Sequence, residues 1–178
     1  NQWSEKYQGE GKFTDKARAN KDLMLGSFDI PGDAASDIND VADIFDGDNN
    51  FNKDQIAEIL GAIGFFESKY KTKVQGGDGP ARSYWQVEPK TAKSILAENL
   101  GAMKTGRKQF LGPKFEALFK NKYKDVIGNK TALQYFASLS EEELKDLLLK
   151  DGAFAASMAA HKVITTFDPY SPKEEIEV

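Results

Sequence analysis

The second half of the chain is a succession of short segments that each have the pattern of an amphipathic helix. From Pro89 onwards the predicted helices are Lys90–Leu100, Pro113–Tyr123, Thr131–Ser138, Ser140–Leu149 and Ala153–Phe167. Glycines fall at the breaks between these segments, where helices commonly end: Gly101, Gly112, Gly128 and Gly152. No period of about 20 to 50 residues repeats, which argues against a solenoid. The sequence therefore predicts a mainly α-helical protein.

Length and composition fit one folded domain. The 178 residues correspond to about one domain of ordinary size. With 24 basic and 28 acidic residues the formal net charge is −4, so the chain has no overall basic field that would hold a nucleic acid. The chain contains no cysteine and a single histidine, His161. This composition excludes disulfides, thiol catalysis and metal sites built from cysteine or several histidines.

The two ends of the chain differ in character from its middle. The longest clean apolar run, residues 62–66, is far shorter than the roughly 18 residues of a membrane span. The first residue is Asn1 and no apolar signal-peptide region follows it, so we expect the chain to be cut from a longer polypeptide. Polar, glycine-containing residues 1–35 predict an extended N-terminal arm that docks on another surface. A compact domain is expected over 36–170, with 171–178 as a C-terminal tail.

An acidic loop follows a short helix that is expected to begin at Ser36. Its oxygen-bearing residues alternate as in an EF-hand calcium loop: Asp46, Asp48, Asn50, Asn52 and Asp54. The match fails at the sixth position, where Phe51 replaces glycine, and at the twelfth, where Ala57 replaces glutamate. A capping box of Asn52 and Gln55 at the start of the next helix is the better interpretation. Calcium binding by this loop stays open as the weaker alternative.

The next predicted helix, from about Asp54 to Lys71, places an acidic residue on its apolar side. At about 100° per residue, six residues form one stripe: Ile56, Ile59, Leu60, Ile63, Phe66 and Tyr70. Glu67 falls at about 20° from Ile56, inside this stripe, whereas Glu58 and Lys69 fall at about 200° and 220°, on the opposite side. The wheel therefore predicts that Glu67 faces the core and that Glu58 faces solvent.

A glutamate on an apolar stripe has two explanations. Glu67 is either a buried structural carboxylate paired with Arg82 or Lys69, or a functional acid that desolvation keeps protonated. Ionisable groups are rarely buried without a partner or a purpose. Spacing alone leaves both explanations open.

The segment after this helix has the composition of a sugar-binding cleft. Gln75–Pro80 is rich in glycine and predicts a small irregular β-hairpin or loop. It is followed by Tyr84, Trp85 and Gln86. Aromatic faces stack on sugar rings and amides bond to hydroxyl and acetamido groups, so we expect one of the two aromatic residues to contact sugar and the other to pack. Cleavage of a glycoside also requires a protonated carboxyl group, which favours the functional explanation of Glu67.

These residues resemble the lytic transglycosylase and goose-type lysozyme superfamily. Glu67-Ser68 at the end of an apolar helix is followed by a segment that is similar to phage members of this superfamily, Gly79-Pro80-Ala81-Arg82-Ser83-Tyr84-Trp85-Gln86-Val87-Glu88. A late alanine-rich helix before Asp168-Pro169 adds to the resemblance, which covers about Ile56 to Pro169. The chain departs from the pattern at Ser83, where glycine is usual, at Asp151 and Ala155, where many members have Asn and Gly, and in lacking a final Ala-Tyr-Asn motif.

The resemblance implies a lysozyme-like α+β fold, mainly α-helical, with a catalytic glutamate at a helix end and a small irregular β or loop region. It implies that Glu67 is the catalytic acid, that Gln86 lines the sugar cleft and that Ser68 accompanies the acid. Tyr84, Trp85 and Glu88 complete the expected substrate-binding residues. The implied reaction is cleavage of the bond between N-acetylmuramic acid and N-acetylglucosamine in peptidoglycan, with no metal and no cofactor. Water as acceptor gives hydrolysis and the C6 hydroxyl gives an anhydro sugar, and the sequence leaves this choice open.

The sequence also suggests candidates for a second carboxylate and a role for His161. A second carboxylate near the scissile bond would favour hydrolysis, and Asp78 or Glu88 could supply it. Glu88 can equally form an ion pair with Arg82. His161 shares a helix face with Met158, and we expect it to be a hydrogen-bonded residue of the core or of the cleft wall because it has no nucleophile or metal partner.

The phage-like branch of the superfamily implies a virion protein that acts on the bacterial cell wall or in the periplasm. The expected partners are peptidoglycan glycan strands and, through the N-terminal arm, other virion proteins, without nucleic acid or a membrane span. One alternative is a catalytically inactive lysozyme-like module that has a structural or glycan-binding role in a virus particle. Another is a cellular chitinase-like glycosidase.

Overall fold

The computed structural model describes residues 29–47 and 51–167 and shows a mainly helical protein. The α-helices are α4 (Gly32–Ile44), α5 (Lys53–Ser68), α6 (Pro89–Thr105), α7 (Pro113–Lys122), α8 (Lys124–Ile127), α9 (Ala132–Ala137), α10 (Glu141–Lys150) and α11 (Gly152–Phe167), with a 3-10 turn η1 (Gly76–Asp78). The expected small β region is reduced to two isolated antiparallel bridges, Val74 with Arg82 and Arg82 with Val87, and no β-strand occurs among the described residues. The prediction of a mainly α-helical protein is confirmed.

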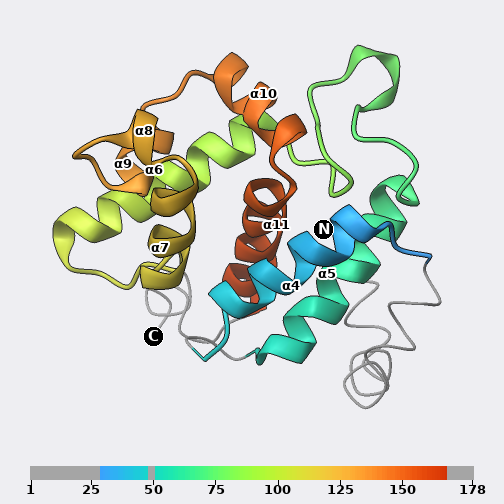
Figure 1. Cartoon of the computed structure of the whole chain (residues 1–178), viewed down its shortest axis with the longest axis horizontal. Coiled ribbons are helices and arrows are strands. Elements are labelled where there is room, and N and C mark those ends of the chain that lie inside the picture. Colours follow the sequence, from blue (N-terminus) through green and yellow to red (C-terminus); the bar gives the residue numbers. More distant parts are fainter. Residues whose placement is uncertain (1–28, 48–50, 168–178) are drawn as a thin grey trace.

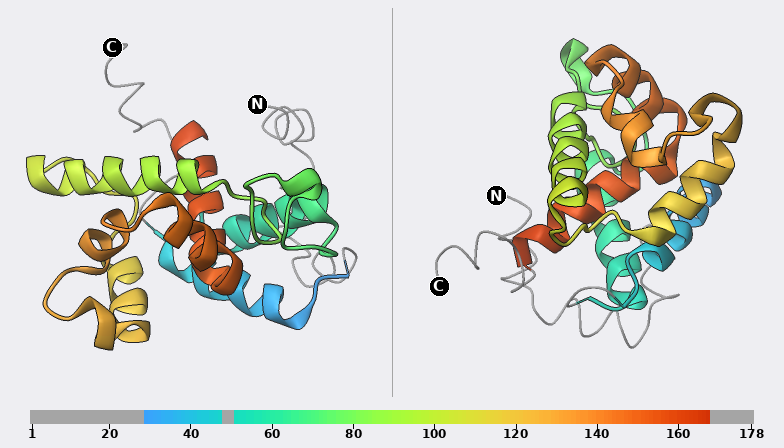
Figure 2. Two further views of the ribbon diagram at one scale, coloured as in Figure 1. Left: turned by 90° about the horizontal axis from the view of Figure 1, so that it is seen from above. Right: turned by 90° about the vertical axis from the view of Figure 1, so that its left-hand side faces the viewer.

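Helix α11 forms the centre of the molecule (Figure 1). It contacts α4 and α5 on one side and α6 and α10 on another. Alanines occupy much of its sequence, including Ala155, Ala156 and Ala160, and all three are buried. Small side chains allow neighbouring helices to approach closely, which suits α11 to a central position. In Figure 2, α6 crosses over α11, and this crossing brings the start of α6 towards the end of α5.

A cluster of phenylalanines joins the shorter helices to α11. Phe115 and Phe119 of α7 contact Phe136 of α9, and Phe136 contacts Phe154 of α11 with ring centroids 4.9 Å apart. All four rings are at most 1% exposed. Buried aromatic side chains contribute strongly to stability through the area that they remove from water. The cluster therefore holds α7 and α9 against the central helix.

Capping boxes mark the starts of two helices as expected from the sequence. Asn52 and Gln55 form the expected capping box, and Ser140 and Glu143 form another at the start of α10. The glycine signal was wrong at Gly101, which lies inside α6, because this helix continues to Thr105 and ends at Gly106 with φ of 73°. Such a positive φ is the usual conformation of a glycine after a helix. Helix α4 begins at Gly32, four residues before the expected start at Ser36. Residues 32–35, which were expected in the extended arm, are therefore helical.

The predicted orientation of α5 is wrong. Its residues from Ile56 to Gly64 are all buried, including Glu58 at 0% exposed, whereas Glu67 is exposed and Phe66 is 43% exposed. A helical wheel assumes one buried and one solvent face, and that assumption fails for a segment that is enclosed all round and then emerges at its end. The helix also ends at Ser68 instead of Lys71, because the next two residues have φ of 54° and 56°.

Several expectations about the chain ends lie outside the described residues. These are most of the N-terminal arm, the tail 171–178, the Asp168-Pro169 pair and the middle of the acidic loop. Within the described part, Asp46 accepts a hydrogen bond from the backbone amide of Lys53 at 3.0 Å. In the same part of the chain, no helix has the length and apolar character of a bilayer span.

Candidate active site

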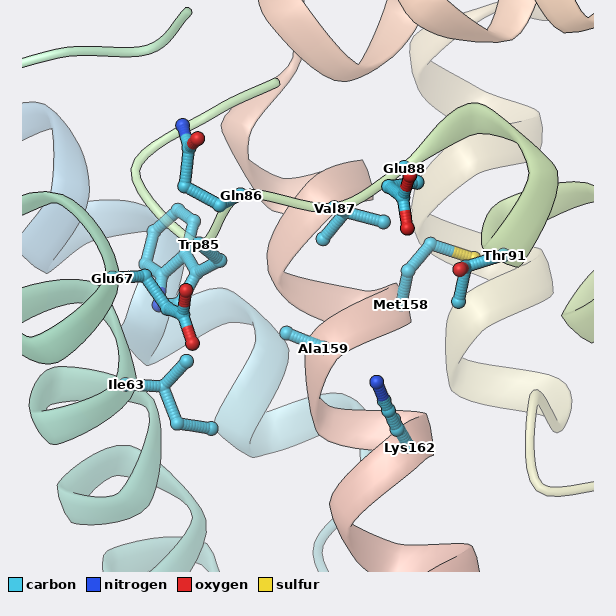
Figure 3. Close-up of a pocket in the computed structure, with 10 residues that line it drawn as sticks. All are labelled: Ile63, Glu67, Trp85, Gln86, Val87, Glu88, Thr91, Met158, Ala159 and Lys162. Carbon is cyan, nitrogen blue, oxygen red and sulfur yellow. The ribbon is translucent and has the colours of Figure 1, made fainter. Parts of the chain in front are cut away.

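A cleft of about 280 Å³ opens between the end of α5, the loop before α6 and the middle of α11. Residues from four parts of the chain line it: Ile63, Glu67, Trp85, Gln86, Val87, Glu88, Thr91, Met158, Ala159 and Lys162. Figure 3 shows Glu67 and Ile63 projecting from α5 towards α11, with Lys162 on the facing helix. The cleft therefore combines apolar walls with three charged side chains.

The end of α5 is anchored by Tyr70. The Tyr70 hydroxyl donates to the carbonyl oxygen of Gly61 at 2.7 Å, and the side chain is only 7% exposed. Burial raises the pKa of this hydroxyl, so it stays a donor. A Cβ atom on Gly64 would lie 2.3 Å from the Tyr70 hydroxyl oxygen. Glycine at position 64 thus lets the chain fold back on α5 immediately after Glu67.

Trp85 forms the apolar wall of the cleft next to Glu67. Its indole nitrogen donates to the carbonyl oxygen of Leu60 at 2.8 Å, and the side chain is 3% exposed. Edge contacts with the rings of Tyr70 and Tyr84 hold the indole in place. The indole is therefore held rigidly, and only a small part of its surface reaches the cleft.

The loop that carries Gln86 is a tight turn closed by backbone pairing. Arg82 and Val87 exchange both backbone hydrogen bonds at 2.9 Å. Inside the turn, Ser83 has φ of 72° and Gln86 has φ of 50°. The Ser83 hydroxyl accepts from the amide of Trp85 at 3.1 Å, and the Gln86 side-chain amide donates to the Ser83 carbonyl at 2.9 Å. The turn therefore fixes Gln86 at the cleft edge with its amide nitrogen already bonded.

The ion pairs considered for the two glutamates do not form. Within the described part of the chain, no cation lies within 4 Å of the carboxylate of Glu67 or Glu88. The Arg82 guanidinium donates instead to the carbonyl oxygens of Gly79 and Ala81, at 2.7 and 2.9 Å. Arg82 therefore shapes the loop and leaves both cleft carboxylates to solvent or to a ligand.

Two predicted site residues lie away from the cleft. The Ser68 hydroxyl donates to the Gly64 carbonyl at 3.0 Å and accepts from the Tyr70 amide at 3.1 Å, so it stabilises the helix end. The Tyr84 hydroxyl lies 3.3 Å from the Asp33 carboxylate, and the Lys73 ammonium lies 4.8 Å from its ring. Neither Ser68 nor Tyr84 lines the cleft.

Of the two candidates for a second carboxylate, only Glu88 reaches the cleft. It is exposed, precedes α6 and lines the cleft. Asp78 is exposed in η1 and is not among the lining residues.

Sequence reasoning missed the contribution of α11. Met158, Ala159 and Lys162 line the cleft from this helix, and Thr91 lines it from α6. Their helical spacing, with one lysine in an otherwise uncharged segment, was visible, but nothing in it indicated which helix would face Glu67. Among the described residues, no group of three or more histidine and acidic side chains is placed to hold a metal ion.

His161 is a core residue, as predicted, but only one of its ring nitrogens is hydrogen-bonded, because Nδ1 has no partner among the described residues. It is 2% exposed, and the Asn99 side-chain amide lies 2.9 Å from its Nε2 atom. The Asn99 oxygen accepts from the backbone amides of Phe110 and Leu111, both at 3.0 Å, so the Asn99 nitrogen is the donor to His161. Burial lowers the pKa of His161 to about 4.

Comparison with known proteins finds no family model, no curated protein and no solved structure that matches the chain.

Proposed function

We propose that this chain is a peptidoglycan-cleaving glycosidase of the lysozyme or lytic transglycosylase type, with Glu67 as its general acid and base. The observation that carries the proposal is that Glu67, Trp85 and Gln86 line one cleft. An acid, a rigid aromatic wall and an amide are the groups that glycoside cleavage and sugar binding require. These residues also belong to the segments that resemble lysozyme-like proteins.

We further propose that the helical arrangement is a lysozyme-like fold. Support comes from the order of the elements around the cleft: the end of α5, the short turn before α6, and α11 on the opposite side. The Ser83 position also supports the correspondence, because its φ of 72° is a conformation that favours glycine, the usual residue there in the superfamily.

In the proposed reaction, Glu67 gives its proton to the oxygen that links N-acetylmuramic acid to N-acetylglucosamine. The acetamido group of the sugar assists departure of the leaving group, and the Glu67 carboxylate then takes a proton from the acceptor. A glycan in the cleft displaces water from between Ile63 and Trp85, and such desolvation favours the uncharged form of a carboxyl group. Water as acceptor completes hydrolysis, whereas the C6 hydroxyl gives an anhydro product.

Glu88 is the proposed second carboxylate. It lines the same cleft as Glu67 from the start of α6. In a two-acid scheme such a carboxylate activates water or stabilises the developing positive charge. Replacement by glutamine is expected to lower the rate less than loss of Glu67, because the general acid would remain.

Clearing of a cell-wall suspension tests the enzymatic proposal. We expect wild type to reduce the turbidity and Glu67→Gln to lose at least about 100-fold in rate, since acid–base catalysis contributes about 10²- to 10⁴-fold. Glu98→Gln, an exposed change on α6 away from the cleft, is the matched control and should retain activity.

The same assay separates the alternatives. Equal inactivity of wild type and Glu67→Gln, with retained binding to cell walls, would support a structural or glycan-binding module of a virus particle. Cleavage of chitin oligomers in preference to peptidoglycan would support a chitinase-like glycosidase.

We propose a virion location on the basis of the similarity to phage proteins. The chain would act on the bacterial cell wall or in the periplasm, and its first 35 residues, most of which lie outside the described part, would contact other virion proteins. Detection of the chain in purified virus particles tests this proposal, and its absence from particles that still infect would contradict it.

A further inference from the structure

Lys162 is the only Asp, Glu, Lys or Arg residue in the sequence of α11, Gly152–Phe167. Its neighbours His161 and Val163 are buried at 2% and 3% exposed, whereas Lys162 is exposed and lines the cleft. Met158 and Ala159, four and three residues earlier, lie on the same side of the helix and also line it. The helix thus presents one cation to the cleft from an apolar surface.

The Lys162 ammonium has no ion-pair partner in the described part of the chain. No carboxylate there lies within 4 Å of it, although Glu67 and Glu88 line the same cleft. Several other lysines are paired, including Lys73 with Asp33 at 3.0 Å and Lys122 with Asp151 at 3.2 Å. A cation left open on a cleft wall is available to an anionic group of a ligand.

We propose that Lys162 selects glycans that carry a carboxylate, by pairing with that carboxylate when the sugar chain lies against Trp85. This inference rests on the proposed function and identifies the substrate group that the cleft would recognise. In peptidoglycan the carboxylate belongs either to the lactyl group of muramic acid or to the attached peptide. The cleft holds two carboxylates of its own and one ammonium, so a polymer with closely spaced negative charges would be repelled, whereas an isolated carboxylate fits.

Binding measurements in a Glu67→Gln background test the proposal without turnover. The ligands are a chitin oligomer, a peptide-free glycan strand with free lactyl carboxylates, the same strand with these groups reduced to alcohols, and a strand that keeps its peptides. Lys162→Met is expected to weaken binding of the carboxylate-bearing strands by about 10- to 100-fold, because a hydrogen bond to a charged group has that effect on affinity. Binding of the chitin oligomer and the reduced strand should not change.

The controls separate charge recognition from damage to the cleft. Lys162→Arg should keep most of the preference, and Lys104→Met, an exposed change at the far end of α6, should keep all of it. Loss of affinity for the peptide-free strand identifies the lactyl group as the source of the carboxylate, and loss confined to the peptide-bearing strand identifies the peptide. Equal weakening of all four ligands, or no weakening of any, would overturn the proposal.

The outcome is distinguishable from failure of the proposed function. If Lys162 governs the carboxylate preference but wild type cleaves no glycan, the recognition stands and the enzymatic proposal fails. If wild type cleaves peptidoglycan while Lys162→Met keeps the same preference, the enzymatic proposal stands and the assignment of Lys162 fails.

Discussion

Gly64 and Tyr70 together determine how the chain leaves α5. The Tyr70 ring occupies the space over Gly64, and a Cβ atom there would lie 2.4 Å from the ring carbon that carries the hydroxyl. The hydroxyl also bonds to the Gly61 carbonyl at 2.7 Å. This contact holds the segment that follows Glu67 against α5.

Replacement of Gly64 by alanine is therefore expected to destabilise the protein. Displacing a buried ring and its hydrogen bond costs about 1 to 3 kcal/mol, which exceeds the gain of about 1 kcal/mol from alanine in a helix. Gly101 is the matched control, since it also lies inside a helix and the nearest atom to an added Cβ is 3.8 Å away. Gly101→Ala should stabilise slightly. Urea unfolding of both variants measures the difference, and equal effects would contradict this account.

His161 makes stability depend on pH. Its pKa of about 4 in the folded protein lies below the value of about 6.5 expected in an unfolded chain. The unfolded chain therefore takes up this proton first as the pH falls, so the contribution is complete above about pH 6.5 and is lost towards pH 4. The shift corresponds to about 3 kcal/mol.

Urea unfolding between pH 4 and pH 7 checks this expectation. Wild type should lose more free energy of unfolding than His161→Gln as the pH falls through this range. The same dependence on pH in both proteins would show that His161 does not titrate as the structure indicates.

At the scale of elements, two aspartates, Asp37 and Asp151, lie where α4 meets the start of α11. A Cβ atom on Gly152 would lie 1.9 Å from an oxygen of Asp37, which shows how closely the two helices approach. Asp151 is 7% exposed. Its carboxylate forms an ion pair with Lys122 and accepts a hydrogen bond from the backbone amide of Phe154 at 3.0 Å. Burial and the nearby Asp151 raise the pKa of Asp37 to about 6.

Asp37 changes the stability of the protein with pH in the opposite direction to His161. A carboxyl group with a raised pKa in the folded protein stabilises it at low pH, and this contribution falls as the pH rises from about 4 through about 6. Asp37→Asn should therefore be more stable than wild type at pH 7, and the advantage should shrink at pH 4. Thermal unfolding at both pH values measures this, with exposed Asp125→Asn as the control. A less stable Asp37→Asn at pH 7 would contradict the prediction.

Helix starts that carry a capping box were easier to predict than helix ends and orientations. Asn52 and Ser140 mark their helices through local hydrogen bonds that sequence neighbours supply. The continuation of α6 through Gly101 depends on contacts made elsewhere along that helix, and a lone glycine costs only about 1 kcal/mol. Glu58 is buried and Glu67 is exposed, the reverse of the prediction, because the burial of α5 is set by the elements around it. Such contacts are not encoded within the segment itself.

At the scale of the whole molecule, the cleft joins residues that are far apart in the sequence. The sequence pattern pointed to six site residues, of which Glu67, Trp85, Gln86 and Glu88 line the cleft, whereas Ser68 and Tyr84 do not. The opposite wall, with Met158 and Lys162, comes from α11 about 90 residues after Glu67. Local patterns do not carry that information, since it arises from the packing of α11 against α5 and α6.

The mass of the soluble products tests the central claim most directly. Purified peptidoglycan is incubated with wild type, Glu67→Gln and Glu98→Gln, and the released fragments are analysed by mass spectrometry. The account predicts muropeptides cut between N-acetylmuramic acid and N-acetylglucosamine from wild type and Glu98→Gln, as hydrolysed or anhydro products that differ by one water, and almost none from Glu67→Gln. No fragments from wild type, or the same fragments in the same yield from Glu67→Gln, would contradict it.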